Sequence, residues 1–419
     1  MKAIFIHPSH PNQFTRIAHG LAAEGWDCAF LVDEAFATQV QQDNPPIPYF
    51  GFKEEPAAVS GSYYTRSFEE GARRGKAVAE ALAHLIADEG VDVALGHASF
   101  GVTFFLGHLF DIPVVSYVEL PGYFPAYARE EFPAFYSQAL LDVSLRALIH
   151  TSVLHSDLCV VPSRHARDLL PRELRPKVRV QMEGFDLPEP VPDRTRLRGE
   201  LGLDPARPVV GFASRTLEAV RGFDFFLRAA RAIFGRRPDV QFLVLGDEST
   251  LYGNESAYLA GKSFKQHALE SGGVPQEVCH FRSFMQHDQF VRHLQSMDLA
   301  LFPVFEGAAN WGLFEAMAAG VPVLASNRCF IPEVIRDGRE GFLFDPRDDA
   351  GFAGAALRLL ASPDEARALG ENGRRRIARH YSTARARRGY DAILREALAI
   401  HNGRQRAGGC PDPRRPGPR

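Results

Sequence analysis

Two arginines flank a short loop that has the residue types for binding a diphosphate. The segment SRTLEAVRGF places Arg215 and Arg221 on either side of Glu218. Gly222 follows directly, at the start of a predicted helix. Guanidinium groups bind phosphate oxygens through paired hydrogen bonds, and the first N–H groups of a helix have no partner within it. The alternative is a solvated surface loop, but the position directly after an apolar, strand-like run favours an anion site.

Two glutamates lie in the apolar segment FEGAANWGLFEAMAAG, residues 305–320. Glu306 follows a predicted strand, and Glu315 lies in the next predicted helix. One carboxylate can accept hydrogen bonds from two neighbouring hydroxyls, which is a common way to hold a ribose or a hexose. For Glu315 the alternative is a helix-surface carboxylate that pairs with a nearby arginine. The aromatic and aliphatic neighbours favour a binding role.

The first half of the chain contains further polar side chains whose type and position do not indicate one particular chemistry. His97 and Glu119 each follow a predicted strand. A single histidine is more often structural than catalytic, so both residues are only candidates for a site at the strand ends. His7 and His10 follow the first predicted strand and could suggest a metal pair, but no third ligand is apparent, and we expect no metal site.

The elements that must position these side chains alternate along nearly the whole chain. Short apolar runs rich in Val, Ile and Phe are followed by amphipathic segments, a pattern typical of parallel sheets with crossover helices. Strands are predicted at 2–6, 28–32, 91–95, 112–117, 157–161, 178–182, 208–213, 240–245, 298–302 and 321–325, and helices at 14–24, 68–88, 223–234 and 313–319. The pattern predicts an α/β protein of two doubly wound Rossmann-like domains that face each other across a cleft, with ligands at the carboxyl ends of the strands.

A proline-rich interval separates the two series of strands. Residues 184–208 contain five prolines and no long apolar run. The expected order is an N-terminal domain over 1–184, a linker over 185–207, a C-terminal domain over 208–380, a helix over 381–402 that returns to the N-terminal domain, and a disordered tail over 403–419. The aromatic-rich residues 121–136 are compatible with an acceptor groove or with a cover over the cleft.

Composition limits the class of protein further. Of 419 residues, 45% are hydrophobic and 24% charged, which indicates a globular protein rather than a disordered one. A formal net charge of -3 provides no broad cationic field, so nucleic acid is not an expected partner. Peripheral membrane contact stays open.

Cysteine usage and hydropathy indicate the compartment. The five cysteines are odd in number and far apart, and they form no CxxC, which argues against a disulfide scaffold or a structural zinc site: Cys28, Cys159, Cys279, Cys329 and Cys410. No apolar run approaches the roughly 20 residues of a membrane-spanning helix, and the N-terminus lacks the apolar region of a signal peptide. We therefore expect a cytoplasmic location.

Eight segments of the chain occur in an order known from one enzyme family. The segments FASRTLEAVRGFDFFLRAA, FLVLGDE, SMDLALFPVFEG, GLFEAMAAGVPVLAS and PEVIRDGREGFLFDP cover most of residues 208–346. The first half adds HPSHPNQFTRIAHGLAAEGWDCAFLVDE, VALGHASFG and DLCVVPSRHARDLL. Together they resemble the large retaining glycosyltransferase family 4, which has the two-domain GT-B fold. The first-half segments resemble a subgroup with an HPNxPxQF-like start.

The resemblance implies a reaction and its substrates. It implies retaining transfer of a sugar from a nucleoside-diphosphate sugar, bound on the C-terminal domain, to a saccharide, glycolipid or other glycoconjugate bound on the N-terminal domain. Relatives commonly act in polysaccharide biosynthesis. No cofactor is implied, and the absence of a DxD sequence is consistent with transfer that needs no metal.

The resemblance also assigns roles to residues. Arg215 and Arg221 would bind the donor diphosphate and stabilise it as it leaves, Glu315 would hold the nucleotide ribose, and Glu306 would lie near the donor sugar. The implied nucleotide site also includes Gly312, Leu313 and Phe284, the last in the segment 280–286 that would contact the base. His97 and Glu119 complete the predicted catalytic set.

Three departures from the family pattern keep alternatives open. Arg221 stands where most relatives have lysine, which keeps the charge and adds a planar fork. Glu306 and Glu315 are one residue further apart than usual, and Glu119 stands near the place of a histidine in many relatives. The alternatives are another GT-B enzyme, such as a nucleotide-sugar epimerase or a phosphorylase, and a decayed transferase that binds a nucleotide or a protein. The chain has no GxGxxG after its first strand, no Walker sequence and no GxSxG, which disfavours dehydrogenase, nucleotidase and esterase activities.

Overall fold

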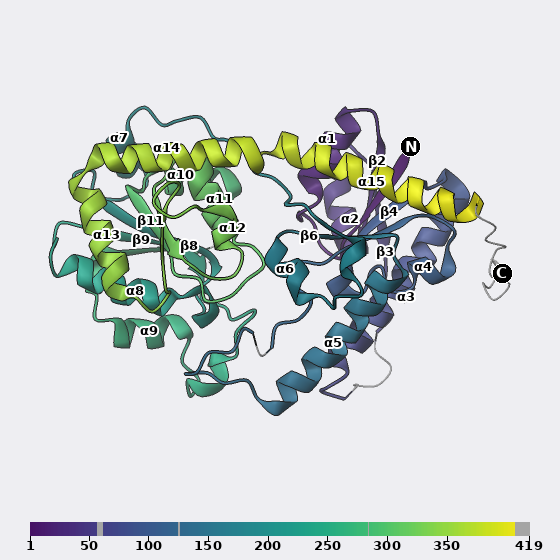
Figure 1. Ribbon diagram of the computed structural model, residues 1–419, viewed down its shortest axis with the longest axis horizontal. Coiled ribbons are helices and arrows are strands. Elements are labelled where there is room, and N and C mark those ends of the chain that lie inside the picture. The colour runs from purple at the N-terminus through teal and green to yellow at the C-terminus, as the bar shows by residue number, and fades with distance from the viewer. Residues whose placement is uncertain (57–61, 125, 284, 407–419) are drawn as a thin grey trace. The chain divides into compact units, whose positions relative to one another are not determined.

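The protein consists of two compact units, each described here by itself. The structure, a computed structural model, describes residues 1–56, 62–124, 126–283 and 285–406. The first unit comprises Met1–Gly122, Phe135–Gly184 and the chain from Thr383 onward. The second unit comprises Tyr123–Ala134 and Phe185–Ser382 (Figure 1).

A seven-stranded parallel sheet in the order β3-β2-β1-β4-β5-β6-β7 forms the centre of the first unit. Its strands are β1 (Lys2–Ile6), β2 (Asp27–Asp33), β3 (Tyr49–Phe52), β4 (Val93–His97), β5 (Val114–Tyr117), β6 (Leu158–Val161) and β7 (Val178–Val180). Its helices are α1 (Thr15–Ala23), α2 (Glu34–Gln41), α3 (Arg66–Glu89), α4 (Leu106–Leu109), α5 (Tyr136–His155), α6 (Arg164–Leu169) and α15 (Thr383–Arg406).

Alternate residues of the central strand point into two separate hydrophobic layers. Ala3 and Phe5 pack with residues of α1 and α15, whereas Ile4 and Ile6 pack with residues of α3. A strand buried on both faces reads as a continuous apolar run, which is why KAIFI predicted a strand of parallel sheet so clearly.

The second unit has a six-stranded parallel sheet in the order β10-β9-β8-β11-β12-β13. Its strands are β8 (Val209–Thr216), β9 (Gln241–Asp247), β10 (Cys279–Arg282), β11 (Leu299–Phe302), β12 (Val323–Ser326) and β13 (Phe342–Phe344). Its helices are α7 (Arg194–Glu200), α8 (Phe223–Phe234), α9 (Phe264–Gly272), α10 (His287–Gln295), α11 (Trp311–Ala318), α12 (Ile331–Val334), α13 (Asp349–Ala361) and α14 (Pro363–His380). Helices α8, α9 and α13 contribute to one core with Val210 and Phe212 of β8. The predicted fold class, two doubly wound α/β units, is confirmed.

Both sheets reverse their strand order beside their first strand. In the first unit the reversal lies between β1 and β4, and in the second unit between β8 and β11. Ligands of open α/β sheets bind where the strand order reverses, outside the carboxyl ends of the strands. His7 and His97 lie at this point of the first unit, and the loops that carry Arg221 and Glu306 lie at this point of the second.

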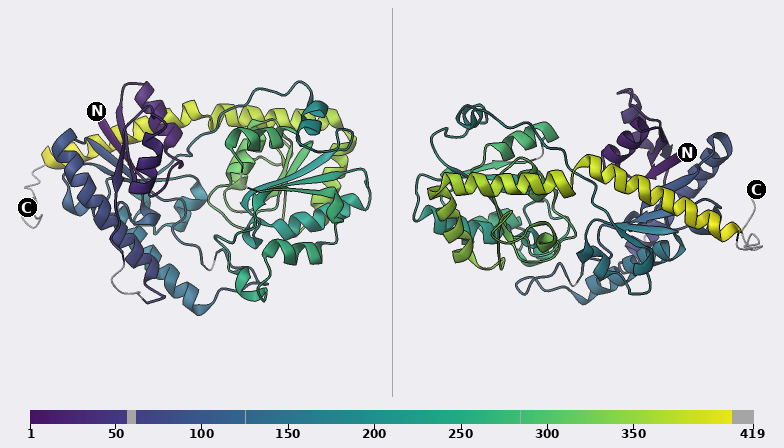
Figure 2. Two further views of the ribbon diagram at one scale, coloured as in Figure 1. Left: turned by 180° about the vertical axis from the view of Figure 1, so that it is seen from behind. Right: turned by 45° about the horizontal axis from the view of Figure 1, so that its top comes forward.

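Helix α15 is an integral part of the first unit. In the views of Figures 1 and 2 it runs along α1, and five of its side chains enter the same core layer: Ala386, Tyr390, Ile393, Leu394 and Ala397. The indole of Trp26 donates a 2.7 Å hydrogen bond to Asp391. The helix continues to Arg406, so residues 403–406 are helical rather than part of a disordered tail as we expected. The remaining tail residues lie outside the described residues.

Two other segments differ from the expected domain plan. Tyr123–Ala134 belongs to the second unit, although the sequence placed all of 1–184 in the first. Phe132 lies in the second unit's core, 5.8 Å from the ring of Phe264. The expected linker 185–207 is also structured, since α7 buries Leu197 against the second unit and Arg198 donates to Asp298 at 2.6 Å.

The cysteines and the helix lengths agree with the sequence-based expectations where the structure describes them. Cys28, Cys159, Cys279 and Cys329 are free thiols, and Cys410 lies outside the described residues. Among the helices of the described ranges, none combines the length and apolar character needed to traverse a bilayer.

We expect Leu394→Ala to lower the free energy of unfolding of the first unit by about 2 to 5 kcal/mol, because it leaves a cavity at a fully buried position of α15. Urea denaturation followed by circular dichroism measures this loss. Arg388→Ala, at an exposed position of the same helix, is the control and should change stability little. Equal stability of the two variants would show that α15 does not support the first unit's core.

Candidate functional site

The loop between β8 and α8 is shaped by one glycine. Ala219–Arg221 forms a single 3-10 turn, and Gly222 closes it in a left-handed conformation with φ +75°. A Cβ atom at Gly222 would lie 1.9 Å from the carbonyl oxygen of Pro303. Only glycine permits this φ and this approach together, so the loop after β8 is pressed against the loop after β11.

Arg221 lies beside the Glu306 segment. Its guanidinium is 7% exposed and stacks over the ring of Tyr252 at 4.9 Å. A Cβ atom at Gly307 would lie 3.0 Å from Nη1 of Arg221. Arg221 and Glu306 also both act electrostatically on Cys329, whose pKa burial raises to about 12. The structure therefore brings Arg221 and Glu306 together, as a shared binding site requires.

The loop after β11 accommodates the unusual spacing of the two glutamates. The N–H groups of Phe305 and Glu306 both donate to the carbonyl of Val220, at 2.9 and 3.4 Å. The Glu306 carboxylate accepts from the N–H of Gly307 at 2.8 Å. Ala308, Ala309 and Asn310 are then buried before α11 begins. The longer spacing is thus taken up by a packed loop that leaves Glu306 half-buried.

Helix α11 presents Glu315 from its second turn. Asn310 caps the helix, because its side chain accepts from the N–H of Leu313 at 3.2 Å. A Cβ atom at Gly312 would lie 2.9 Å from the carbonyl of Ala213, so glycine lets α11 approach β8. Glu315 is 8% exposed and accepts a 2.6 Å hydrogen bond from Nε2 of His287. Gly312 and Leu313, which the resemblance placed in the nucleotide site, are both buried in the first turn of this helix.

The remaining predicted residues of this unit differ in their surroundings. Arg215, near the end of β8, is exposed and has no hydrogen bond or ion pair to the residues that the structure describes. Phe284 lies outside the described residues. Glu218, between the two arginines, is fully buried and accepts from the N–H groups of Leu251 and Tyr252, so it braces a neighbouring loop.

The chemistry of the carboxyl ends of this sheet follows from the residues that its loops carry. The guanidinium of Arg221 beside Glu306, and the exposed guanidinium of Arg215 near the end of β8, offer planar donors to an anion. A half-buried and a nearly buried carboxylate offer acceptors to hydroxyl groups. A phosphorylated sugar carries both kinds of group, so the arrangement suits such a ligand.

The corresponding edge of the first unit is buried and weakly charged. His97 is 2% exposed, and its ring lies 5.6 Å from that of His7, 4.6 Å from Phe100 and 5.0 Å from Tyr117. Burial lowers the pKa of His97 well below its usual value, so this imidazole is neutral. Its Nδ1 has no hydrogen-bond partner among the described residues.

A second buried group at this edge is a carboxylic acid. Tyr117 donates its phenolic proton to Glu183, which is 4% exposed. Burial, together with the nearby charge of Glu119, raises the pKa of Glu183 to about 7. Glu119 is half-buried and acts electrostatically on Tyr117 as well. The two first-unit candidates, His97 and Glu119, therefore border the same tyrosine.

His7 has a structural explanation. The N–H of Ser9 donates to its Nδ1 at 3.0 Å, and burial lowers the pKa of His7 to about 4. Across the described ranges no cluster of three or more His, Cys, Asp or Glu side chains is arranged to hold a metal ion.

Three residues of the second-unit site were not predicted. His287 pairs with Glu315, Tyr252 lies under Arg221, and Arg328 lies 4.2 Å over the ring of Phe305. Arg328 could have been found, since it follows the predicted strand 321–325 directly. Nothing in the sequence links His287 to Glu315 or Tyr252 to Arg221, because those contacts join distant segments.

Two family models match the chain, one in each unit. The model described as "Glycosyl transferase family 4 group" matches residues 24–189, and the model described as "Glycosyl transferases group 1" matches residues 207–362. Both confirm the family that the motifs suggested.

Curated relatives match about half of the chain. A D-inositol 3-phosphate glycosyltransferase of Segniliparus rotundus is 29% identical over 47% of this chain and 42% of that relative. One from Rhodococcus jostii is 29% identical over 52% and 48%. Spore coat protein SA of Bacillus subtilis is 27% identical over 50% and 52%. The chain therefore spans about half the length of the curated relatives it matches.

Solved structures match nearly the whole fold. Sucrose-phosphate synthase from Thermosynechococcus elongatus has a TM-score of 0.74 at 20% identity and covers 95% of this chain and 99% of that one. HepE of Anabaena in complex with UDP-glucose has a TM-score of 0.69 at 18% identity, with coverage of 94% and 99%. At these identities the likeness establishes the GT-B fold.

Glu183 gives the first unit a distinct dependence of stability on pH. Between about pH 4.5 and pH 7 the unfolded chain ionises this carboxyl while the folded chain keeps its proton, so the residue lowers the free energy of unfolding as pH rises. Glu183→Gln removes this effect. Relative to wild type, its free energy of unfolding should rise by on the order of 2 kcal/mol between about pH 5 and about pH 8.

Urea denaturation at both pH values measures the difference. Glu70→Gln, at an exposed position of α3, is the control and should show no such change. An identical pH dependence in wild type and Glu183→Gln would contradict a buried, protonated Glu183.

Proposed function

Because this chain belongs to the glycosyltransferases of family 4 and group 1, we propose that it transfers a sugar from a nucleoside-diphosphate sugar to an acceptor. The donor binds the second unit and the acceptor binds the first. The observation that carries the proposal is the meeting of Arg221 with the Glu306–Gly307 segment at the point where the second sheet reverses.

The proposed role of the arginines follows from the charge that the reaction creates. Breaking the bond between the sugar and the diphosphate leaves negative charge on the departing phosphate. Arg215 and Arg221 supply fixed positive charge, which stabilises the transition state more than the bound substrate. In this proposal the guanidiniums do what a divalent cation does in DxD enzymes, and the reaction needs no metal or other cofactor.

The carboxylates position the two sugars of the donor. Glu315 accepts hydrogen bonds from the ribose hydroxyls, and His287 orients it from the other side. Glu306 lies beside Arg221 and contacts the sugar that is transferred.

The first unit contributes the acceptor side. The neutral imidazole of His97 can accept a proton or a hydrogen bond from a hydroxyl, and Glu119 can orient a second one. Family membership favours retention of configuration at the anomeric carbon. The acceptor proposed is a saccharide, glycolipid or other glycoconjugate, and the protein acts in the cytoplasm.

The relatives suggest which donor to try first. Two of the curated relatives reported above are named D-inositol 3-phosphate glycosyltransferase, and HepE was solved with UDP and with UDP-glucose. Uridine diphosphate is therefore the first nucleotide to test, alongside GDP, ADP and TDP. Consumption of a sugar donor with acceptor-dependent release of the diphosphate would exclude a decayed transferase, and epimerisation without an acceptor would favour the epimerase alternative.

The diphosphate assignment predicts the effect of removing the arginines. Arg215→Ala and Arg221→Ala should each lower kcat/KM by about 10- to 150-fold, because each removes a charge-assisted contact worth about 1.5 to 3 kcal/mol. Transfer and nucleotide affinity are measured with whichever of UDP, GDP, ADP and TDP raises the wild-type melting temperature most. Arg236→Ala, an exposed arginine at the far end of α8, is the control. Near-normal transfer and affinity in both variants would remove the assignment.

The ribose assignment predicts a different pattern for Glu315→Gln. The affinity for the nucleoside and for its diphosphate should fall together, by about 10- to 100-fold, because the lost acceptor serves the ribose in both. Calorimetric titration measures both affinities, and circular dichroism confirms the fold. Glu365→Gln, on the exposed face of α14, is the control. Unchanged nucleoside affinity would return Glu315 to a structural role.

A further inference from the structure

A segment from the first half of the chain reaches the loop that carries Arg221. Residues 123–134 follow β5 in sequence but pack in the second unit. The carbonyl of Pro133 accepts from Asn254 at 2.9 Å and from the hydroxyl of Tyr258, and Phe132 enters the core. The segment is therefore held at its end, and Arg129 projects from it.

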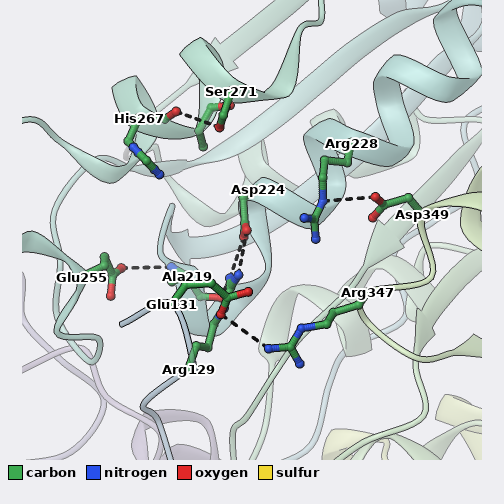
Figure 3. Close-up of polar contacts among 11 residues, drawn as sticks. Arg129, Glu131, Ala219, Asp224, Arg228, Glu255, His267, Ser271, Arg347 and Asp349 are labelled. Atoms are coloured by element: carbon green, nitrogen blue, oxygen red, sulfur yellow. Dashed lines mark hydrogen bonds and ion pairs between the residues drawn. The ribbon is translucent and has the colours of Figure 1, made fainter. Parts of the chain in front are cut away.

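Arg129 and Glu255 together hold the backbone of one residue of that loop, Ala219, on both sides. Nη1 of Arg129 donates to the carbonyl of Ala219 at 3.1 Å, and the N–H of Ala219 donates to Glu255 at 3.0 Å. Figure 3 shows Arg129 and Glu255 approaching Ala219 from different directions. Both side chains are nearly fully buried, at 3% and 1% exposure. Since Ala219 begins the turn that ends at Arg221, both contacts determine where Arg221 lies.

The same guanidinium neutralises an acid beside the proposed phosphate site. Arg129 binds Asp224 through two parallel bonds of 2.8 and 2.9 Å. Asp224 lies in the first turn of α8, two residues after Gly222. An unpaired carboxylate there would repel a diphosphate, because like charges a few ångströms apart interact strongly when partly buried. The paired Asp224 exerts little of this repulsion.

The segment also supports the other side of Arg221. The rings of Tyr123 and Tyr127 lie 6.1 and 6.2 Å from the ring of Tyr252, over which Arg221 stacks. One segment thus contacts both the main chain before Arg221 and the ring beneath its guanidinium.

We propose that Arg129 is a positioning residue for the donor diphosphate: it sets the Ala219–Arg221 turn and cancels the charge of Asp224. This inference rests on the proposed function, since it assumes a diphosphate beside Arg221. The competing explanation is that Arg129 only stabilises the second unit. The two explanations differ in whether the removal of Arg129 weakens only the binding of the phosphate groups of the ligand.

Helix α8 itself carries an arginine that serves as a control. Arg228 pairs with Asp349 at 3.1 Å, one turn beyond Asp224. Arg129 and Arg228 both lie over the ring of Phe225, at 4.1 and 4.6 Å. Figure 3 shows the two pairs in one view, and among the described residues Arg228 makes no hydrogen bond to the Ala219–Arg221 turn. Arg228→Met therefore removes a neighbouring, more exposed ion pair and a similar stacking contact on Phe225 without touching the turn.

The test compares affinities for a nucleoside diphosphate and for its parent nucleoside in the full chain, with the base chosen from UDP, GDP, ADP and TDP by melting-temperature shift. Arg129→Met should weaken diphosphate binding by about tenfold or more and nucleoside binding by less than about twofold. Arg129→Met combined with Asp224→Asn should recover part of the loss, because the second change removes the uncompensated charge. Arg228→Met should leave both affinities unchanged.

Four outcomes overturn the inference. Equal weakening of nucleoside and diphosphate binding by Arg129→Met indicates general destabilisation, and equal behaviour of Arg129→Met and Arg228→Met removes the special role. If Arg129→Met does not fold, Arg129→Lys decides, because lysine lacks the planar fork that bonds Asp224 and Ala219 together. Its diphosphate affinity should fall more than its nucleoside affinity, and a diphosphate affinity equal to wild type contradicts the proposal. Failure of the wild-type chain to bind any of the four nucleotides overturns the proposed function and this inference with it.

Discussion

The position of Arg221 depends on one residue, Ala219, whose backbone N–H and carbonyl are both held by buried side chains. The guanidinium of Arg129 binds the carbonyl and the carboxyl of Glu255 binds the N–H, and Gly222 ends the turn where no other residue fits against Pro303. Buried charged groups that lose a partner cost more than the pair contributes, so such a turn resists displacement. A guanidinium on this turn is held ready for an anion before the anion arrives, which is the condition for electrostatic catalysis.

The two units use one topology for different chemistry. Each has a site where its strand order reverses, as doubly wound sheets require. The second unit has Arg221 and the half-buried Glu306 there, and these groups suit a charged donor in the proposed function. The first unit has the neutral imidazole of His97 there, which suits hydroxyl groups. This division agrees with a donor that carries charge and an acceptor that does not.

Much of the fold could be predicted because buried parallel strands have continuous apolar runs. All ten predicted strands and all four predicted helices are present, with ends within three residues of the prediction. The edge strands β3, β10 and β13 were missed, because three or four residues exposed on one side carry no such run. The packing of residues 123–134 in the second unit could not be predicted either. Their aromatic side chains indicate that the segment is buried, but not against which sheet.

Site residues could be predicted only where a single loop or helix contains the whole signal. Arg215, Arg221, Glu306 and Glu315 could be proposed from the sequence because each lies at or after the end of a predicted strand or in the helix that follows, and family motifs support the choice. Arg129, His287 and Tyr252 could not, because each acts on a residue that is far away in the sequence. Contacts between segments that are distant in sequence depend on how the folded chain packs, and a single sequence does not reveal them.

A crystal structure of the chain with its nucleoside diphosphate tests the central claim most directly. The phosphate oxygens should lie within hydrogen-bond distance of both Arg215 and Arg221, with the ribose hydroxyls on Glu315. A diphosphate bound elsewhere, with these three side chains turned away from it, would contradict the account.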